Sequence, residues 1–212
     1  MKKLLVIGAG GHARSVIDSA LDSKEFDEIG VVSSNKLEWD TYRGVSWIGA
    51  DEDAKRLFDE GFHYAVLGIG FMGNGSPLRE RLFELYKEIG FRFSSIIDPS
   101  AIVSKGSVID EGVFIGKGAV VNANAHIGCC SIINSASLVE HDCIIGDFTH
   151  IAVRAVLCGA VSVGSRVLVG ANSTVLQELT VGDGAVIGAG ALVISNVSPG
   201  KKALGLYKGS DK

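Results

Sequence analysis

The segment Ser-Leu-Val-Glu-His-Asp at residues 137–142 sets one imidazole between two carboxylates. An imidazole with a pKa of about 6.5 accepts a proton at neutral pH, and an adjoining carboxylate orients the ring and stabilises its charged form. His141 is therefore our candidate general base, with Asp142 or Glu140 as its acidic partner. The alternative is a histidine in a solvated turn that takes part in no chemistry.

The sequence does not favour a metal site. Neither the histidines near His141 nor the four cysteines have the spacing of metal ligands. His126 lies 15 residues before His141 and His150 lies 9 residues after it, and no further set of convergent ligands is visible. No carboxylate adjoins His126, so we interpret it as structural. The cysteines show no Cys-x-x-Cys spacing, which favours reduced thiols over a zinc ribbon or a disulfide framework.

A second candidate for chemistry is the segment Gly8–Ala13, which follows a short apolar run and opens a helical pattern. Backbone N–H groups and the helix dipole hold phosphate at such a place. A redox dinucleotide site would also need an acid after the second strand, where this chain has Ser33 and Ser34, so hydride transfer is disfavoured. We expect a diphosphate here, with Gly68 and the loop 70–75 along the same sheet edge. The alternative is a glycine-rich turn that serves only close helix packing.

Strand-like and helix-like segments alternate over the first hundred residues. The pattern predicts strands at 3–7, 29–32, 45–48, 64–68 and 91–97, and helices at 15–21, 51–58 and 77–89. Such alternation is typical of a small parallel sheet covered by helices, a Rossmann-like α/β domain. Asp98-Pro99 ends it, because proline restricts the residue before it, so we assign residues 1–98 to this domain.

From Ala101 to Asn196 the period changes to six residues. In all 16 hexads the third residue is aliphatic, and the first is mostly Ala, Ser, Thr or Cys. Hexapeptide repeats predict a parallel β-helix with three hexads in each triangular coil, so that equivalent residues stack about 18 positions apart. We expect the third and first places to face inward and Gly and Asn to make the turns. Residues 99–197 then form the β-helix and 198–212 a tail; a β-sandwich would need longer strands.

This coil period relates the candidate residues to one another. Gly159 lies 18 positions after His141, so it should stack on the same face with its N–H as a weak candidate oxyanion donor. His150 lies half a coil away and faces elsewhere within one subunit. Across a three-fold interface it could meet the same cleft.

Composition excludes several classes of partner. The 212 residues carry 24 acidic and 20 basic side chains, a net charge of −4, and no Lys/Arg cluster, so nucleic acid is not an expected partner. No apolar run reaches the length of about 18 residues that spans a bilayer, so no membrane association is expected. We expect a cytoplasmic protein.

A small α/β domain that opens with Gly10-Gly11-His12 and leads directly into hexapeptide coils with Glu140-His141-Asp142 resembles a known family. It is similar to the hexapeptide-repeat sugar acetyltransferases, which include the UDP-4-amino-sugar N-acetyltransferases of N,N′-diacetylbacillosamine synthesis and relatives that acetylate GDP-perosamine or sialic acid. The resemblance implies a left-handed parallel β-helix, a homotrimer, acetyl-CoA as cosubstrate without a metal, and a nucleotide-linked amino sugar as acceptor.

The resemblance also implies roles for individual residues. The family's general base falls on His141 and its acidic neighbour on Asp142. Contacts to acetyl-CoA fall on His150, Ala171 and Ala189, and contacts to the nucleotide sugar on Gly10, Gly11, His12, Ser33, Ser34 and Gly68. Other functions stay open: a sugar O-acetyltransferase of the sialic acid type, transfer from a different acyl-CoA donor, a non-catalytic trimeric scaffold that binds sugars, and a metal-dependent lyase or hydratase.

Overall fold

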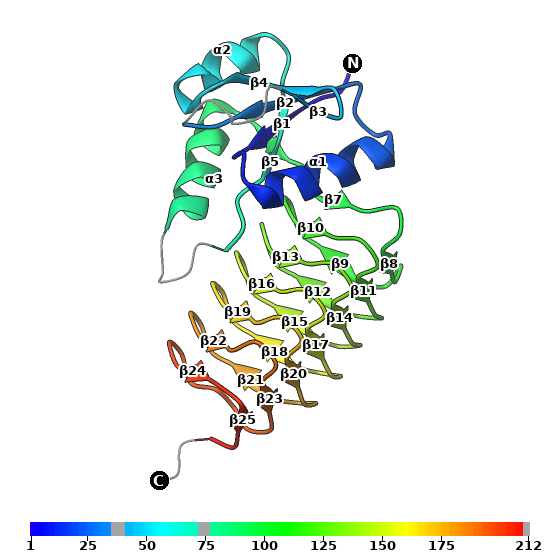
Figure 1. Ribbon diagram of the computed structural model, residues 1–212, viewed down its shortest axis with the longest axis vertical. Helices are drawn as coiled ribbons and strands as arrows, with labels where there is room; N and C mark the ends of the chain where they lie inside the picture. Colours follow the sequence, from blue (N-terminus) through cyan, green and yellow to red (C-terminus); the bar gives the residue numbers. More distant parts are fainter. Residues whose placement is uncertain (35–40, 72–76, 210–212) are drawn as a thin grey trace. The chain divides into compact units, whose positions relative to one another are not determined.

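The computed structural model describes residues 1–34, 41–71 and 77–209 (Figure 1). The chain forms two compact units, Met1–Pro99 and Ser100–Lys212. No helix in the described part of the chain has the length and apolar character needed to cross a bilayer.

The first unit contains a sheet with strand order β3-β4-β2-β1-β5-β6. Its central strand β1 pairs in parallel with β2 and β5, and its residues from Leu4 to Ile7 are buried. Strands covered on both faces read as continuous apolar runs, which is why this segment is apolar throughout. The strands are β1 (Lys3–Ile7), β2 (Glu28–Val32), β3 (Thr41–Tyr42), β4 (Val45–Gly49), β5 (Tyr64–Leu67) and β6 (Arg92–Phe93), with β7 (Ile96–Ile97) following.

The predicted parallel sheet carries one additional short antiparallel strand at its edge. Strand β3 pairs antiparallel with β4. Arg43 and Gly44 connect them with φ of 48° and 84°, the two left-handed residues of a tight hairpin turn. Two residues are too short a strand to produce an alternating pattern in the sequence.

Helices cover both faces of this sheet. Helix α1 (Gly11–Ser23) lies on one face, and α2 (Ala54–Asp59) and α3 (Leu78–Ile89) pack together on the other (Figure 1). A short 3-10 turn, Asp51–Asp53, precedes α2. Helix α3 ends where Gly90 takes φ 116°, a left-handed conformation that glycine adopts without strain.

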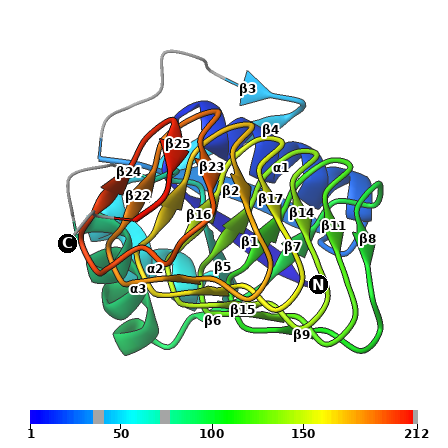
Figure 2. The same cartoon turned by 90° about the horizontal axis from the view of Figure 1, so that it is seen from below.

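The second unit is a left-handed parallel β-helix whose coils are seen end-on in Figure 2. Every hexad contributes one two-residue strand at its second and third places, and each strand from β8 to β20 pairs in parallel with the strand 18 residues later. The strands are β8 (Ile102–Val103), β9 (Val108–Ile109), β10 (Phe114–Ile115), β11 (Val120–Val121), β12 (His126–Ile127), β13 (Ile132–Ile133), β14 (Leu138–Val139), β15 (Ile144–Ile145), β16 (His150–Ile151), β17 (Val156–Leu157), β18 (Ser162–Val163), β19 (Leu168–Val169), β20 (Thr174–Val175), β21 (Thr180–Val181), β22 (Val186–Ile187) and β23 (Leu192–Val193).

The coil has three faces, which we name by their strands. Face A holds β8, β11, β14, β17, β20, β23 and β25; face B holds β9, β12, β15, β18 and β21; face C holds β10, β13, β16, β19, β22 and β24. The turns between them form three edges, A–B, B–C and C–A, on which residues 18 apart stack.

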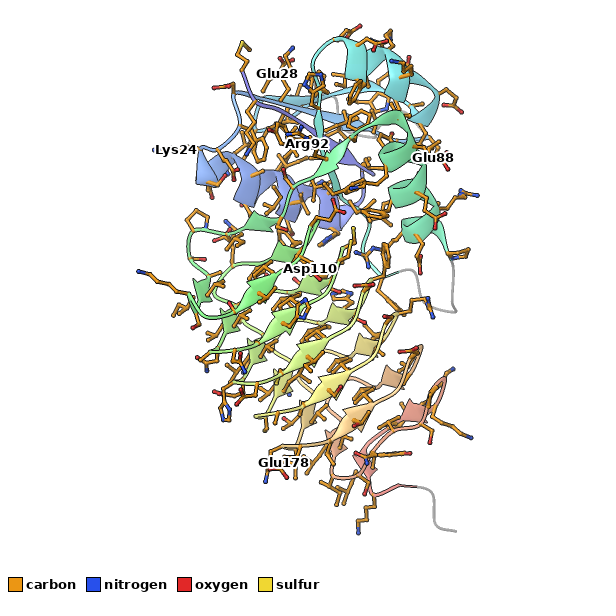
Figure 3. The ribbon with its side chains drawn as sticks, turned by 180° about the vertical axis from the view of Figure 1, so that it is seen from behind. Lys24, Glu28, Glu88, Arg92, Asp110 and Glu178 are labelled. Carbon is orange, nitrogen blue, oxygen red and sulfur yellow. The ribbon has the colours of Figure 1, made fainter. Side chains whose placement is uncertain are left out.

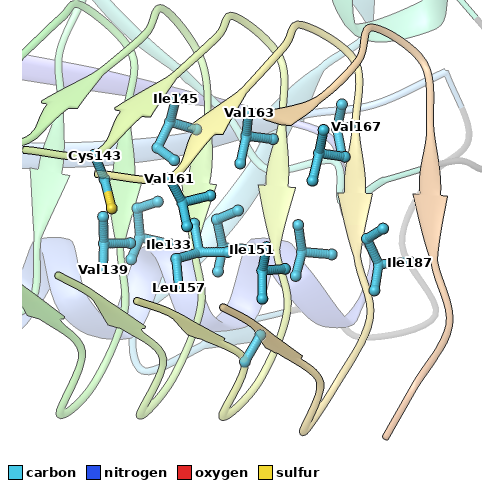
Figure 4. Packing of buried hydrophobic residues seen from close by; sticks show 14 of the residues in the cluster. Ile133, Val139, Cys143, Ile145, Ile151, Leu157, Val161, Val163, Val167 and Ile187 are labelled. Atoms are coloured by element: carbon cyan, nitrogen blue, oxygen red, sulfur yellow. The ribbon is translucent and has the colours of Figure 1, made fainter. Parts of the chain in front are cut away.

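The interior confirms the predicted inward places. From Ile115 onward every third-place side chain is buried, and small first-place residues such as Cys143 share the interior (Figure 4). Buried polar residues at the first place have partners: Thr149 Oγ1 donates to the carbonyl of Gly164 over 2.7 Å and accepts from the N–H of Val167. A buried hydroxyl is tolerated only when it is bonded in this way.

The turns differ from the expectation that glycine and asparagine make them. Every sixth-place residue from Gly112 to Gly190 has positive φ, including Phe148 (54°), Arg154 (57°) and Glu178 (61°). Glu178 projects from the outside of the coil (Figure 3). The N–H of each of these three residues donates to the carbonyl 19 positions earlier, and these bonds between coils hold the conformation whatever the side chain.

Residues 198–212, expected as a separate tail, belong to the second compact unit. Strand β24 (Lys202–Ala203) pairs with β22, and β25 (Leu206–Tyr207) pairs with β23. Ser195 Oγ also donates to the carbonyl of Lys208 over 2.9 Å. Because this stretch lacks the six-residue pattern, its pairing with the coil could not be seen in the sequence.

Candidate active site

His141 and Asp142 lie on edge A–B, in the turn between β14 and β15. The ring Nδ1 lies 2.8 Å from Asp142 Oδ2, and both side chains are at least half exposed. Asp142 occupies the left-handed sixth place with φ 60°. The turn therefore presents an oriented imidazole on the outer surface, with Nε2 pointing away from its carboxylate partner.

Both carboxylates beside the imidazole are anchored by amides from the preceding coil. Asn124 Nδ2 donates to Asp142 Oδ1 over 2.7 Å, and Asn122 Nδ2 donates to Glu140 Oε1 over 2.9 Å. The second oxygen of Glu140 accepts the backbone N–H of His141 over 3.0 Å. Sequence reasoning missed both asparagines, although subtracting 18 from 140 and 142 would have found them.

These contacts set the protonation of the pair. The hydrogen bond that His141 donates to Asp142 raises the pKa of His141, and the negative charge of Glu140 adds to this effect. The hydrogen bond from Asn124, followed by that from His141, lowers the pKa of Asp142. Asp142 consequently stays ionised and makes the imidazole a stronger base.

Gly159 stacks beside His141 one coil later, as the period predicts. A Cβ placed on Gly159 would lie 2.7 Å from both Cε1 and Nε2 of the ring, so the imidazole occupies the space that glycine leaves. Within the described residues the N–H of Gly159 has no acceptor. It is thus available as a donor close to the ring.

The three residues matched to acetyl-CoA lie elsewhere on the coil. His150 is on face C, with Nε2 3.1 Å from Asn134 Nδ2, and Ala171 and Ala189 are exposed on edge C–A. The N–H of Gly190 donates to the carbonyl of Ala171, which shows that the two alanines are on successive coils. Face C lies opposite edge A–B in a triangular coil, so one chain does not bring this group to His141.

A cavity of about 530 Å³ lies at the carboxyl ends of β1, β2 and β5 in the first unit. All six residues matched to the nucleotide sugar line it: Gly10, Gly11, His12, Ser33, Ser34 and Gly68. Gly70 also lines it, whereas most of the loop 70–75 falls outside the described residues. The carboxyl edge of a parallel sheet is where α/β domains bind ligands.

The glycines of this cavity divide into two kinds. A Cβ on Gly8 would lie 2.5 Å from Ile69 Cγ1, and one on Gly68 would lie 2.8 Å from Val6 Cγ1, so these two serve close packing. A Cβ on Gly10 or Gly11 would meet nothing within 4 Å. Helix α1 begins there without a side-chain cap, so its first N–H groups face open space that suits an anion.

Two charged residues of the cavity were not foreseen. Asp51 follows β4, and its Oδ1 accepts a hydrogen bond of 2.9 Å from the hydroxyl of Tyr86. Burial and this carboxylate together raise the pKa of Tyr86, so the phenol remains a donor. Arg81, in the first turn of α3, adds an exposed cation. Spacing alone did not single them out, because neither belongs to a motif.

The remaining candidates do not assemble a further site. Burial raises the pKa of the Cys143 thiol to about 11, and its Sγ donates to the carbonyl of Cys158, which makes Cys143 a poor nucleophile. His126, expected without an acidic neighbour, lies 3.0 Å from Asp110 through Nε2. Among the described residues no group of three His, Cys, Asp or Glu is placed to hold a metal ion.

Comparisons with known proteins agree with this architecture. Residues 3–85 match the family model of the PglD N-terminal domain. The chain is 30% identical to GDP-perosamine N-acetyltransferase from Caulobacter crescentus, solved as a histidine variant with CoA and GDP-perosamine; the match covers 99% of this chain and 98% of that one, with a TM-score of 0.90. The acetyltransferase domain of PglB from Neisseria gonorrhoeae is 28% identical over 97% of each chain, also with a TM-score of 0.90.

Proposed function

The chain belongs to the hexapeptide-repeat sugar N-acetyltransferases, and on this premise we propose that it transfers the acetyl group of acetyl-CoA to a nucleotide-linked amino sugar, with His141 as the general base. The acetyl-CoA-dependent acyltransferase class follows from the family. The single observation that carries the assignment of the base is the anchored pair of His141 and Asp142, oriented by Asn124 from the preceding coil.

The transfer is direct. The neutral sugar amine attacks the thioester carbonyl, and His141 Nε2 takes the proton that the nitrogen loses. Asp142 stays ionised and stabilises the imidazolium, while the N–H of Gly159 is placed to stabilise the tetrahedral oxyanion. Collapse breaks the carbon–sulfur bond, and the imidazolium proton goes to the CoA sulfur. The products are the N-acetyl sugar and free CoA thiol.

The cavity of the first unit is the proposed site of the nucleotide sugar. The uncapped N-terminus of α1 at Gly10 and Gly11 holds the diphosphate, and Arg81 adds a cation for it. Ser33, Ser34 and Asp51 offer polar contacts to the nucleoside. The acceptor we propose is a UDP-linked 4-amino-4,6-dideoxy sugar, and a GDP-linked one is tested beside it because the Caulobacter relative binds GDP-perosamine.

A homotrimer would complete the site. Face A presents aliphatic side chains outward, among them Ile102, Leu192 and Leu206, which are 67%, 40% and 54% exposed. Its two borders are edge A–B with His141 and edge C–A with Ala171 and Ala189. Packing between copies along this face would cover the apolar residues and set the base of one copy against the acetyl-CoA residues of the next. We propose a cytoplasmic enzyme on the same premise.

The test is release of CoA thiol from acetyl-CoA in the presence of UDP-, GDP- and dTDP-linked amino sugars and of sialic acid. We expect turnover with one sugar nucleotide and a loss of at least about a hundred-fold in His141→Ala, the scale of a positioned base. Retained turnover in the variant would remove His141 from the mechanism. Turnover with sialic acid alone would make the enzyme an O-acetyltransferase, and no turnover at all would favour a scaffold.

A further inference from the structure

Asn124 holds the carboxylate of Asp142 from one coil below. Its Nδ2 donates to Oδ1 over 2.7 Å, while Oδ2 of the same carboxylate lies 2.8 Å from His141 Nδ1. We propose that Asn124 is a positioning residue of the reaction: it fixes Asp142 so that His141 keeps its proton on Nδ1 and presents Nε2 as the acceptor. This inference rests on the proposed function of His141.

The contact is not a general consequence of the coil. Asn124, Asp142, Ala160 and Glu178 occupy successive sixth places on edge A–B with nearly the same φ, between 58° and 61°. In the described chain only the first two of them are joined by a side-chain hydrogen bond. The backbone thus orients the sixth-place side chains alike in every coil. Only the amide of Asn124 and the carboxylate of Asp142 convert this stacking into a hydrogen bond, which we call the clamp.

The clamp matters because the pair lies in solvent. Asp142 is half exposed, so water competes for its oxygens, and ordering a free carboxylate against the ring costs conformational entropy. An amide that donates to Oδ1 orders the carboxylate before substrate arrives. Asn122 donates to Glu140 in the same way, but the other oxygen of Glu140 accepts the backbone N–H of His141 and does not contact the ring. Of the two asparagines, only Asn124 therefore acts on the ring.

The charges that face the ring determine the direction of the effect. Asp142 and Glu140 flank His141 in its own turn, the preceding coil brings the neutral Asn122 and Asn124, and the next coil brings Gly159. Loss of Asn124 frees Asp142 to leave the ring. The hydrogen bond to Asp142 is the interaction that most strongly stabilises the protonated ring, so its loss should lower the pKa of His141.

Two substitutions separate the amide from the backbone. Asn124→Gly keeps a residue that favours positive φ, and Asn124→Ala matches Ala136 and Ala160, which already occupy this place with φ of 55° and 58°. Both variants should fold and differ from the wild type in the same way. Arg166→Ala is the matched control, because Arg166 has φ 57° at the sixth place of edge B–C, away from His141.

The first measurement is the NMR titration of the His141 ring in the substrate-free protein, assigned with His141→Ala. The second is the pH profile of kcat/KM. We expect both Asn124 variants to lower the pKa of His141 by about half a unit, and to move the acid limb of the profile to lower pH by the same amount. We also expect kcat/KM to fall roughly ten-fold, with KM for acetyl-CoA within about two-fold of the wild type.

The outcomes are distinct. A titration and a pH profile unchanged in both Asn124 variants, or changed equally in Arg166→Ala, would overturn the positioning role. If the wild type transfers acetyl to no acceptor, the proposed function fails. The ring titration needs no turnover and still decides whether Asn124 positions Asp142.

Discussion

The imidazole of His141 fills the space that Gly159 leaves free on the next coil, where a Cβ would stand 2.7 Å from Nε2. This nitrogen is the one that must receive the proton of the amine. Gly159 is therefore required for room at the base as well as for its N–H. The contact arises because residues 18 apart stack on one edge, so two positions distant in the sequence form one reacting surface.

Gly159→Ala should separate activity from stability. Its Cβ meets the end of a flexible, exposed side chain, so we expect the free energy of unfolding to change by less than about 1 kcal/mol. The displaced ring should lower kcat/KM roughly a hundred-fold. Gly146→Ala is the contrast, because its Cβ would lie 2.6 Å from the backbone of Gly164 and Ser165 and must destabilise the coil. Thermal unfolding and thiol release, measured on both, decide it; an active Gly159→Ala enzyme would contradict the placement of the ring.

The rate should rise with pH through the raised pKa of His141, because only the neutral ring accepts a proton. Asp142→Asn removes the negative charge of the hydrogen-bond partner that raises this pKa, so the acid limb of kcat/KM should move to lower pH while the plateau falls at least about ten-fold. Titration of the sugar amine is common to both enzymes, so the difference between their profiles belongs to the protein. A limb that does not move would show that another group controls it.

Gly11, the first residue of α1, and Gly8, which directly follows β1, should respond differently to substitution. Gly11→Ala meets no atom and lies in a helix, so its effect on the free energy of unfolding should stay within about 1 kcal/mol. The added Cβ would occupy the open space proposed for the diphosphate and displace it from the N–H groups, so KM for the nucleotide sugar should rise roughly ten-fold, with KM for acetyl-CoA unchanged. Gly8→Ala combines φ 106° with a clash against Ile69 and should destabilise by about 2 kcal/mol. Equal effects of the two substitutions would contradict this division.

A site shared between copies can be tested by mixing inactive subunits. His141→Ala removes the base, and Ala171→Trp blocks edge C–A without touching His141. In randomly mixed trimers about one site in four would take its base and its acetyl-CoA edge from intact faces of two different copies. We therefore expect about a quarter of wild-type activity in the mixture. No recovery would place both edges of the site on one chain.

The interior of the coil was predictable because it depends on one rule. Each two-residue strand turns one side chain inward, so the burial of residues such as Val139 and Ile145 can be predicted from their aliphatic type and their spacing of six. The βαβ order of the first unit was equally visible. Most of the predicted candidates for the nucleotide sugar then line one cavity, because strand ends gather at one edge of a parallel sheet.

What escaped prediction depends on contacts without a pattern. Asn124 became visible only through its bond to Asp142, and Asp51 only through its place beside Tyr86 in the cavity. Phe148 turns with positive φ although its type argues against it, because the stacked coils supply the hydrogen bond that its own preference would not. Residue type alone gives only an intrinsic conformational preference, whereas the roles of these residues are set by hydrogen bonds to residues distant in the sequence.

The strained left-handed turns also mean that the thermal stability of the coil can be raised by substitution. An L side chain with this φ costs about 1 kcal/mol, which glycine largely avoids. Six such places lie apart from the catalytic pair: Cys130, Ala136, Phe148, Arg154, Arg166 and Glu178. Replacing them with glycine or asparagine, one corner at a time, should yield a progressively more heat-resistant enzyme whose chemistry is untouched. The same strain at Asp142 is the one that selection for catalysis must keep.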